Sequence, residues 1–156
     1  MKTFTLETEV TVYAYHELDA EELTLADAAL EATRRSYAPY SQFHVGAAVL
    51  LEDGNIVTGT NQENVAYPSG LCAERTAIFY ANSQHPDVAV KALAIAASDA
   101  QGNATSSPVS PCGACRQVLV ETEKRFGKPM RILLCGAEEV YVAESAASLL
   151  PLSFDF

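Results

Sequence analysis

Three of the four cysteines of this chain lie in two short segments, SGLCAERT at residues 69–76 and SPCGACR at residues 110–116. These segments constrain the fold strongly, because cysteines that share a metal must meet in space although they are far apart in the sequence. Chance cysteines in buried helices, or a disulfide, are the simpler interpretations. In a reducing compartment, however, clustered cysteines more often indicate a metal site or a catalytic site.

The hydrophobic pattern predicts strands that alternate with helices. Strands are expected at residues 3–15, in the two arms of a hairpin within 43–64, and at 90–98, 130–136 and 139–144; helices are expected at 24–37, 69–84, 111–126 and, as a short last element, 145–151. Such alternation is typical of an α/β fold. We therefore expect a three-layer α/β/α sandwich with a mixed sheet of about five strands, plus an extra strand from the N-terminal segment.

Local signals predict where these elements begin and end. Thr24 is a candidate N-cap for the first helix, and Asp53-Gly54 marks the hairpin turn. Ser110 and Gly127 are expected to begin and end the helix that carries the second cysteine segment. No repeat or linker divides the chain, so we expect an extension with an edge strand at residues 1–20 and one domain at residues 21–156.

Composition argues against two classes of partner. Twenty acidic and ten basic residues give a net charge of −10, whereas nucleic-acid binding relies on Lys and Arg to neutralise phosphates. No apolar run approaches the about 20 residues that span a bilayer, and residues 1–10 lack the apolar core of a secretory signal. We therefore expect a cytoplasmic protein with neither a nucleic-acid nor a membrane partner.

Cys112 and Cys115 are spaced so that both sulfurs lie on one face of a helix start and point toward its N-terminus. The partial positive charge there favours thiolates. This pair alone is compatible with a redox motif, half of a zinc site or chance. Cys72, at the start of another predicted helix, would supply a third sulfur if the two helix N-termini meet.

A structural zinc site is normally closed by a fourth ligand. The candidates are Cys135, His16, His44 and His85. Cys135 lies in an apolar run and fits the core, and none of the histidines falls in a ligand-like pair. Three protein ligands leave one coordination position open, which is the arrangement of a catalytic zinc.

Three charged residues adjoin the cysteines. Glu74 follows Cys72 by two positions, where a carboxylate could exchange protons with water on the metal; a helix-start glutamate favoured by the dipole is the simpler interpretation. Arg75 and Arg116 are placed to donate hydrogen bonds to the thiolates, although surface arginines would look the same in the sequence.

The motif CAE…PCxxC matches the zinc nucleoside and nucleobase deaminase signature. More closely, the chain resembles the small homotetrameric cytidine deaminases through YAPYSQFHVGAAV, NQENVAYPSGLCAERTAI, SPCGACRQVL and LLPLSF, in this order. The resemblance implies hydrolytic deamination of cytidine and 2′-deoxycytidine to uridine and 2′-deoxyuridine with release of ammonia, in pyrimidine salvage. It implies one Zn²⁺ per subunit and a homotetramer with shared active sites.

The resemblance also implies a role for each matching position. Cys72, Cys112 and Cys115 would hold the zinc, whose hydroxide attacks C4 of the base, and Glu74 would move the protons. Asn61 and Glu63 would bind a ribose hydroxyl, Phe43 would pack on the base, and the Ala73 backbone would contact the base edge. Tyr67 and Phe154 would enter the site from a neighbouring subunit, and Arg75 would moderate the charge of the thiolates.

The sequence departs from the family pattern at His44, where proline is common, and at Val65, where alanine is usual. Two alternatives stay open at this point. One is a deaminase of another cytosine-bearing small molecule, such as blasticidin S, against which LLPLSF argues. The other is a non-catalytic module stabilised by zinc, in which Glu74 would have no use.

Overall fold

A six-stranded sheet in the order β1-β6-β5-β4-β2-β3 is the middle layer of the computed structural model, which describes residues 1–155. Its strands are β1 (Thr11–Ala14), β2 (His44–Leu51), β3 (Ile56–Thr60), β4 (Val90–Ser98), β5 (Arg131–Cys135) and β6 (Glu139–Ala143). Neighbouring strands are antiparallel except β4 and β5, which are parallel. The expected mixed sheet is therefore confirmed, with β1 as the extra strand at one edge.

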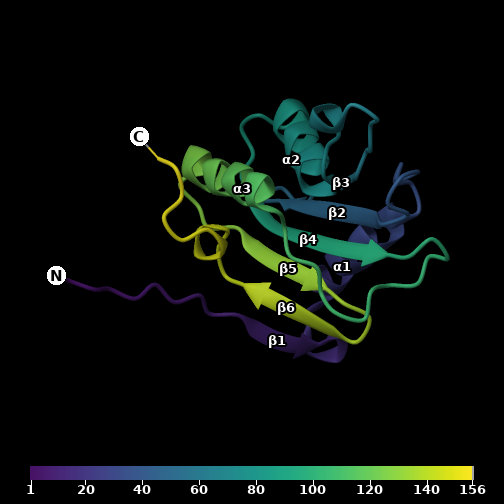
Figure 1. Cartoon of the computed structure of the whole chain (residues 1–156). Helices are drawn as coiled ribbons and strands as arrows, with labels where there is room; N and C mark the ends of the chain where they lie inside the picture. Colours follow the sequence, from purple (N-terminus) through teal and green to yellow (C-terminus); the bar gives the residue numbers. More distant parts are fainter. Residues whose placement is uncertain (156) are drawn as a thin grey trace.

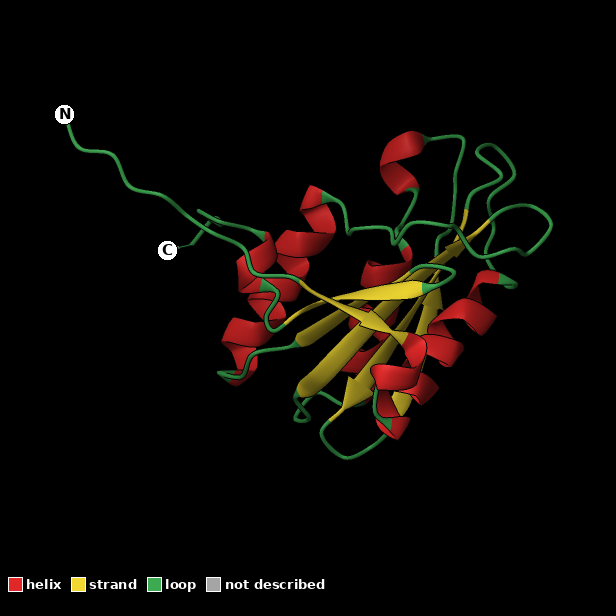
Figure 2. Cartoon of the chain, turned by 90° about the horizontal axis from the view of Figure 1, so that it is seen from below, coloured by secondary structure: helices red, strands yellow, loops and turns green. Residues whose placement is uncertain are grey.

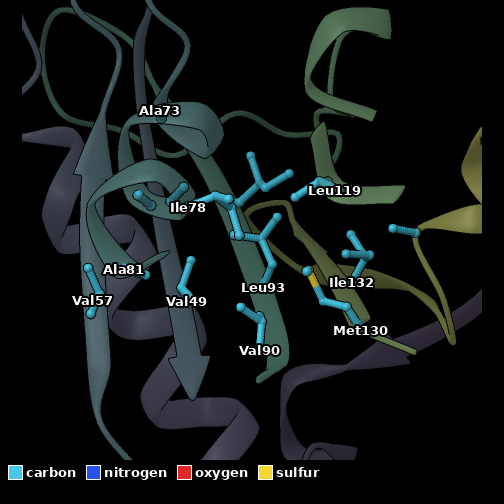
Figure 3. Packing of buried hydrophobic residues seen from close by; sticks show 14 of the residues in the cluster. Val49, Val57, Ala73, Ile78, Ala81, Val90, Leu93, Leu119, Met130 and Ile132 are labelled. Carbon is cyan, nitrogen blue, oxygen red and sulfur yellow. The ribbon is translucent and has the colours of Figure 1, made fainter. Parts of the chain in front are cut away.

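Helices cover both faces of this sheet (Figures 1 and 2). The helices are α1 (Ala20–Thr33), α2 (Ala73–Gln84) and α3 (Gly113–Phe126), together with three short 3-10 helices, η1 (Tyr15–Glu17), η2 (Tyr67–Ser69) and η3 (Ala147–Leu149). One core cluster lies under α2 and α3 (Figure 3), and a second lies under α1. The three-layer α/β/α sandwich predicted from the sequence is confirmed.

The central strand β4 is buried on both faces, as its apolar composition predicts. Leu93 and Ile95 belong to the cluster under α2 and α3. Ala94 and Ala96, which alternate with them, belong to the cluster under α1. This strand therefore contributes side chains to both core clusters, and helices pack against it on both faces of the sheet.

The topology brings the first turns of α2 and α3 to the same end of the sheet. Strand β2 is antiparallel to both β3 and β4, so β3 and β4 run in one direction. Helix α2 follows β3 and helix α3 follows β4, so both helices begin beyond the carboxyl ends of these strands, where α/β sheets carry their sites.

Close packing fixes the start of α2 on β3. A Cβ atom added to Gly59 would lie 2.3 Å from the backbone nitrogen of Ala77 and 2.7 Å from the backbone oxygen of Ala73. Any side chain at this position would therefore push the helix away from the strand. The contact holds the helix N-terminus, with its neighbouring cysteine, at a fixed height above the sheet.

Helix α1 begins four residues earlier than the sequence analysis predicts, so the proposed N-cap Thr24 is wrong. Asp19 accepts a hydrogen bond from the backbone N–H of Glu22 (2.8 Å), and the Glu22 carboxylate accepts one from the backbone N–H of Asp19 (3.2 Å). This complete capping box is the stronger start signal. The Thr24 hydroxyl instead donates to the carbonyl of Ala20 inside the helix.

The N-terminal strand is shorter than the expected residues 3–15. Pairing with β6 ends at Thr11, opposite Val142, because β6 itself ends one residue later. Residues 1–10 are exposed and form no strand. The last element is also shorter than expected, since residues 147–149 form one 3-10 turn, whereas the hairpin turn is confirmed by Gly54, whose φ is +86°.

In the part of the chain that the structure describes, no helix combines the length and the hydropathy that crossing a membrane requires.

Candidate active site

Cysteines occupy the N-cap positions of both α2 and α3. Cys72 caps α2 and Cys112 caps α3, and neither side chain accepts a capping hydrogen bond from a backbone N–H group of its helix. Ser, Thr, Asp and Asn normally fill this position and bond to the free N–H groups. The N-cap of α3 is therefore Cys112 and not the predicted Ser110. Cys112 at N-cap and Cys115 at N3 occupy the two positions whose side chains converge in a capping box.

Three sulfur atoms meet where these helix starts face each other. The Sγ atoms of Cys72 and Cys112 are 3.8 Å apart, and those of Cys112 and Cys115 are 3.5 Å apart. All three lie within 4.8 Å of one another. A tetrahedral zinc with Zn–S bonds of about 2.3 Å separates its sulfur ligands by about 3.8 Å. The cluster therefore fits one zinc ion.

The described residues offer no fourth side-chain ligand to this cluster. Among residues 1–155, no histidine, carboxylate or further cysteine belongs to it. Cys135, the fourth cysteine, is buried in the core under α1. The donor set is thus three sulfurs with one position left for solvent or substrate, which matches a catalytic zinc better than a closed structural one.

Charge around the sulfurs favours a thiolate at Cys72. A hydrogen bond with Cys115 and the nearby Arg75 guanidinium lower the pKa of Cys72 to about 5, against the opposing effect of burial. The Nη2 atom of Arg75 lies 3.7 Å from Cys72 Sγ. The pKa of Cys115 is raised by its bond to the Cys72 sulfur and by burial. Cys72 is therefore favoured in its thiolate form, which is the form that binds a metal, and the Arg75 guanidinium lies beside it.

Glu74 lies in the first turn of α2 and is only 5% exposed. Burial raises the pKa of its carboxyl above the ordinary value, and the charge of Cys72 adds to this effect, while a hydrogen bond with Cys115 opposes it. These contacts place the carboxyl beside the sulfurs without making it a member of the cluster. Burial makes this carboxyl bind a proton more readily than an exposed one, which suits a group that accepts a proton and then returns it.

A cavity of about 600 Å³ opens beside the cluster. Three chain segments line it: Tyr40 and Ser41; Asn61, Gln62, Glu63, Asn64 and Tyr67; and Gly70, Leu71, Cys72 and Arg75. The volume lies within the about 300–1,000 Å³ of small-molecule sites. The cavity therefore joins a metal ligand to the polar residues Asn61 and Glu63.

Hydrogen bonds hold these two polar residues in place. The Asn61 side chain accepts from the backbone N–H of Val45 (2.8 Å) and donates to the carbonyl of Phe43 (2.9 Å). Glu63 accepts from the backbone N–H groups of Tyr40 (2.8 Å) and Ser41 (3.2 Å). The Ser41 hydroxyl and these N–H groups lower the pKa of Glu63 below its ordinary value, so the carboxylate is ionised at neutral pH.

The remaining residues named by the resemblance lie at different distances from the cavity. Ala73 is fully buried in the first turn of α2, directly after Cys72. Tyr67, on η2, lines the cavity of its own chain and is 84% exposed. Phe43 precedes β2 and is partly exposed, and it does not line the cavity. Phe154 lies beside α3, where its carbonyl accepts from Gln117.

Arg116 does not donate to a thiolate, so that expectation is wrong. Its guanidinium donates to the carbonyls of Pro111 (2.8 Å) and Leu149 (2.7 Å). These two acceptors tie the start of α3 to η3. The second acceptor is far away in the sequence, and no sequence signal indicates it.

Sequence reasoning also missed Tyr40 and Ser41, whose backbone N–H groups bind Glu63. Both residues lie in the loop between α1 and β2. Because such loops often carry binding groups, the loop itself was the signal that could have indicated them.

Comparison with known proteins gives a consistent result. Residues 19–126 match a family model described as the cytidine and deoxycytidylate deaminase zinc-binding region. A cytidine deaminase from Sporosarcina psychrophila is 50% identical over 124 residues, which cover 80% of this chain and 84% of that protein. The cytidine deaminase of Halalkalibacterium halodurans is 47% identical over 93 residues, which cover 60% of this chain and 65% of that protein.

Solved structures agree. The crystal structure of cytidine deaminase from Burkholderia pseudomallei superposes with a TM-score of 0.70 at 39% identity, covering 84% of this chain and 97% of that one. The cytidine deaminase structure from Mycobacterium tuberculosis gives 0.68 at 33% identity, covering 88% and 100%. Together with the three-sulfur cluster, these matches establish that the chain belongs to the cytidine and deoxycytidylate deaminase zinc-binding family.

Proposed function

We propose that this protein deaminates cytidine and 2′-deoxycytidine by hydrolysis, giving uridine or 2′-deoxyuridine and ammonia. One observation carries the proposal: a buried carboxyl, Glu74, lies beside a three-sulfur metal cluster, and Cys72 of this cluster lines a cavity of about 600 Å³. Zinc bound to the three sulfurs supplies a Lewis acid that lowers the pKa of water to about 7.

Glu74 moves the protons of the reaction. Its carboxylate takes a proton from the attacking water and delivers it to N3 of the pyrimidine, and it then transfers the second proton of the water to the leaving amine. The raised pKa of Glu74 suits both directions of transfer. A purely structural zinc site would gain nothing from a buried carboxyl with this pKa.

Two polar residues that line the same cavity suit a sugar. The ionised Glu63 and the amide of Asn61 are held rigidly and can accept from and donate to ribose hydroxyls. The backbone of Ala73, next to the cluster, would contact the edge of the base, and Phe43 would pack against its ring. A site of this kind rejects analogues without the hydroxyl, because its own polar groups would be left unpaired.

The test is the loss of cytidine absorbance in the ultraviolet, measured together with ammonia release. We expect turnover that a zinc chelator abolishes and that added Zn²⁺ restores, because the three sulfurs hold the metal that the reaction requires. Blasticidin S is the competing substrate, and the comparisons do not favour it. Zinc-loaded protein that deaminates blasticidin S and leaves cytidine unchanged would overturn the proposal.

We further propose a homotetramer with shared active sites, acting in pyrimidine salvage in the cytoplasm. Apolar side chains are exposed at and near the cavity mouth, with Val65 at 77% and Tyr67 at 84%, and Phe154 is 72% exposed. Val65 and Tyr67 are two residues apart in the chain, and large apolar side chains that are exposed together support a protein partner. We propose that residues 1–10, which carry exposed Phe4 and Leu6, widen the same assembly.

Mixing two inactive variants tests the shared site. A Cys72→Ala subunit lacks a metal ligand, and a Phe154→Ala subunit lacks the side chain that we place in its neighbour's site. We expect mixed tetramers to regain part of the wild-type activity, because one kind of site then has both groups. The control replaces the Cys72→Ala subunit by the double variant, which should restore nothing. Equal activity in both mixtures would contradict the role of Phe154.

A further inference from the structure

Cys112 is the least protected of the three sulfur ligands. Cys115 is buried and Cys72 is partly buried, whereas Cys112 is exposed. As the N-cap of α3, Cys112 makes no capping hydrogen bond through its side chain, so its sulfur does not itself fix the start of the helix. The position of this sulfur therefore depends on the groups that hold the backbone around it.

Arg116 holds the backbone on both sides of the Cys112 side chain. Its backbone N–H donates to the carbonyl of Cys112 (2.9 Å), which is the first hydrogen bond of the helix. Its guanidinium Nε–H donates to the carbonyl of Pro111 (2.8 Å), which precedes the N-cap and has no helical partner. The side chain of Arg116 thus folds back over the first turn of α3 and fixes the backbone from which Cys112 starts.

The same guanidinium is bound to an element that is fixed by other contacts. Its Nη1 atom donates to the carbonyl of Leu149 (2.7 Å), the last residue of η3. The Leu149 side chain belongs to the core cluster under α2 and α3. The Glu123 carboxylate accepts from the backbone N–H groups of Ala146 (2.7 Å) and Ala147 (3.1 Å), which holds the other end of η3. Arg116 therefore connects the exposed metal ligand to the buried core.

We propose that Arg116 is a positioning residue that ties the backbone before Cys112 to η3 and thereby keeps this exposed sulfur in place for zinc. The inference rests on the proposed zinc-dependent function and deepens it. The planar guanidinium presents donors in a fixed fork, so one side chain can hold two carbonyls at once. Groups that orient a metal ligand without touching the metal change metal affinity or activity by about 10–100-fold when they are removed.

The test measures zinc affinity by competition with a chelator, starting from the zinc-loaded protein. We expect the affinity to fall by about tenfold or more in Arg116→Ala, because Cys112 is then held less firmly. Saturating Zn²⁺ should bring kcat for cytidine back to within about threefold of wild type, since Glu74 and all three sulfurs are unchanged. Arg116→Lys keeps the charge but lacks the fork that spans both carbonyls, so it should recover only part of the affinity.

Two residues of the same helix supply controls. Arg125, in the last turn of α3, also donates to a distant carbonyl, that of Pro86 (2.6 Å). Arg125→Ala therefore loses the same kind of hydrogen bond at the other end of the helix and should keep the wild-type zinc affinity. The Gln117 amide donates to the carbonyl of Phe154 (3.1 Å), so Gln117→Ala loosens the C-terminal segment without touching Pro111. This variant should also keep the wild-type zinc affinity.

The outcomes separate the inference from the function on which it rests. The positioning role is wrong if Arg116→Ala binds zinc within about threefold of wild type, if Arg125→Ala loses as much affinity, or if kcat stays low in saturating Zn²⁺. Should Arg116→Ala not fold, Arg116→Lys decides, and wild-type affinity in that variant overturns the role. Zinc-loaded wild-type protein that leaves cytidine unchanged would instead refute the proposed function, and the comparison of zinc affinities would still stand.

Discussion

Glu74→Gln is expected to lower kcat for cytidine by about 10²–10⁴-fold, the range that a positioned general acid–base contributes. Glutamine has nearly the same shape but cannot take a proton from water and return it. The three sulfurs are unchanged, so the variant should keep its zinc. Its melting temperature should not fall, because a buried carboxyl group that pays a desolvation cost has been removed. Steady-state kinetics measure kcat, metal analysis measures the zinc content, and thermal unfolding measures the melting temperature.

Glu123→Gln is the matched control, because Glu123 is the other buried glutamate that the structure describes. Its carboxylate accepts from the backbone N–H groups of Met130 (2.6 Å) and Ala146 (2.7 Å), near the C-terminal end of α3, and none of these residues lines the cavity. We expect this variant to lose stability and to retain kcat. Turnover in Glu74→Gln within about tenfold of wild type would show that Glu74 is not the proton shuttle.

Cys115→Ala is expected to remove nearly all bound zinc and, with it, the activity. Two sulfurs remain, and zinc sites in enzymes need at least three protein ligands. Metal content after gel filtration and the cytidine assay measure the two losses. Since Cys115 is fully buried, the melting temperature should fall as well, partly from the lost metal.

Cys135→Ala separates loss of metal from loss of packing. Cys135 is 3% exposed and lies in the core under α1, so its replacement should also lower stability. It should leave the zinc content unchanged. If the two alanine variants lose zinc to the same extent, the metal is not held by the cluster that the structure brings together.

The sequence predicts most of the site because its chemistry is local. Cys112 and Cys115 lie within one helical turn, and Glu74 lies two residues from Cys72, so each motif can be recognised alone. The α/β alternation then predicts that both helix starts lie at one end of a sheet. The structure adds the distances between the sulfurs and the burial of the carboxyl, which no spacing in the sequence could give.

The errors occur where two local signals compete or where a partner is distant in sequence. Thr24 and Asp19 can both begin a helix, and only the reciprocal bond with Glu22 decides for Asp19. Arg116 stands next to a metal ligand, yet it donates to the carbonyl of Leu149 in another element. The Ser41–Glu63 contact escaped for the same reason, since tertiary structure alone brings these residues together.

The central claim is that three sulfurs and no other side chain hold one zinc beside Glu74. X-ray absorption at the zinc edge of the wild-type protein tests it most directly. We expect one zinc per chain with three sulfur neighbours at about 2.3 Å and no histidine ligand. Four sulfur neighbours, a histidine ligand, or a protein that binds no zinc would contradict the account.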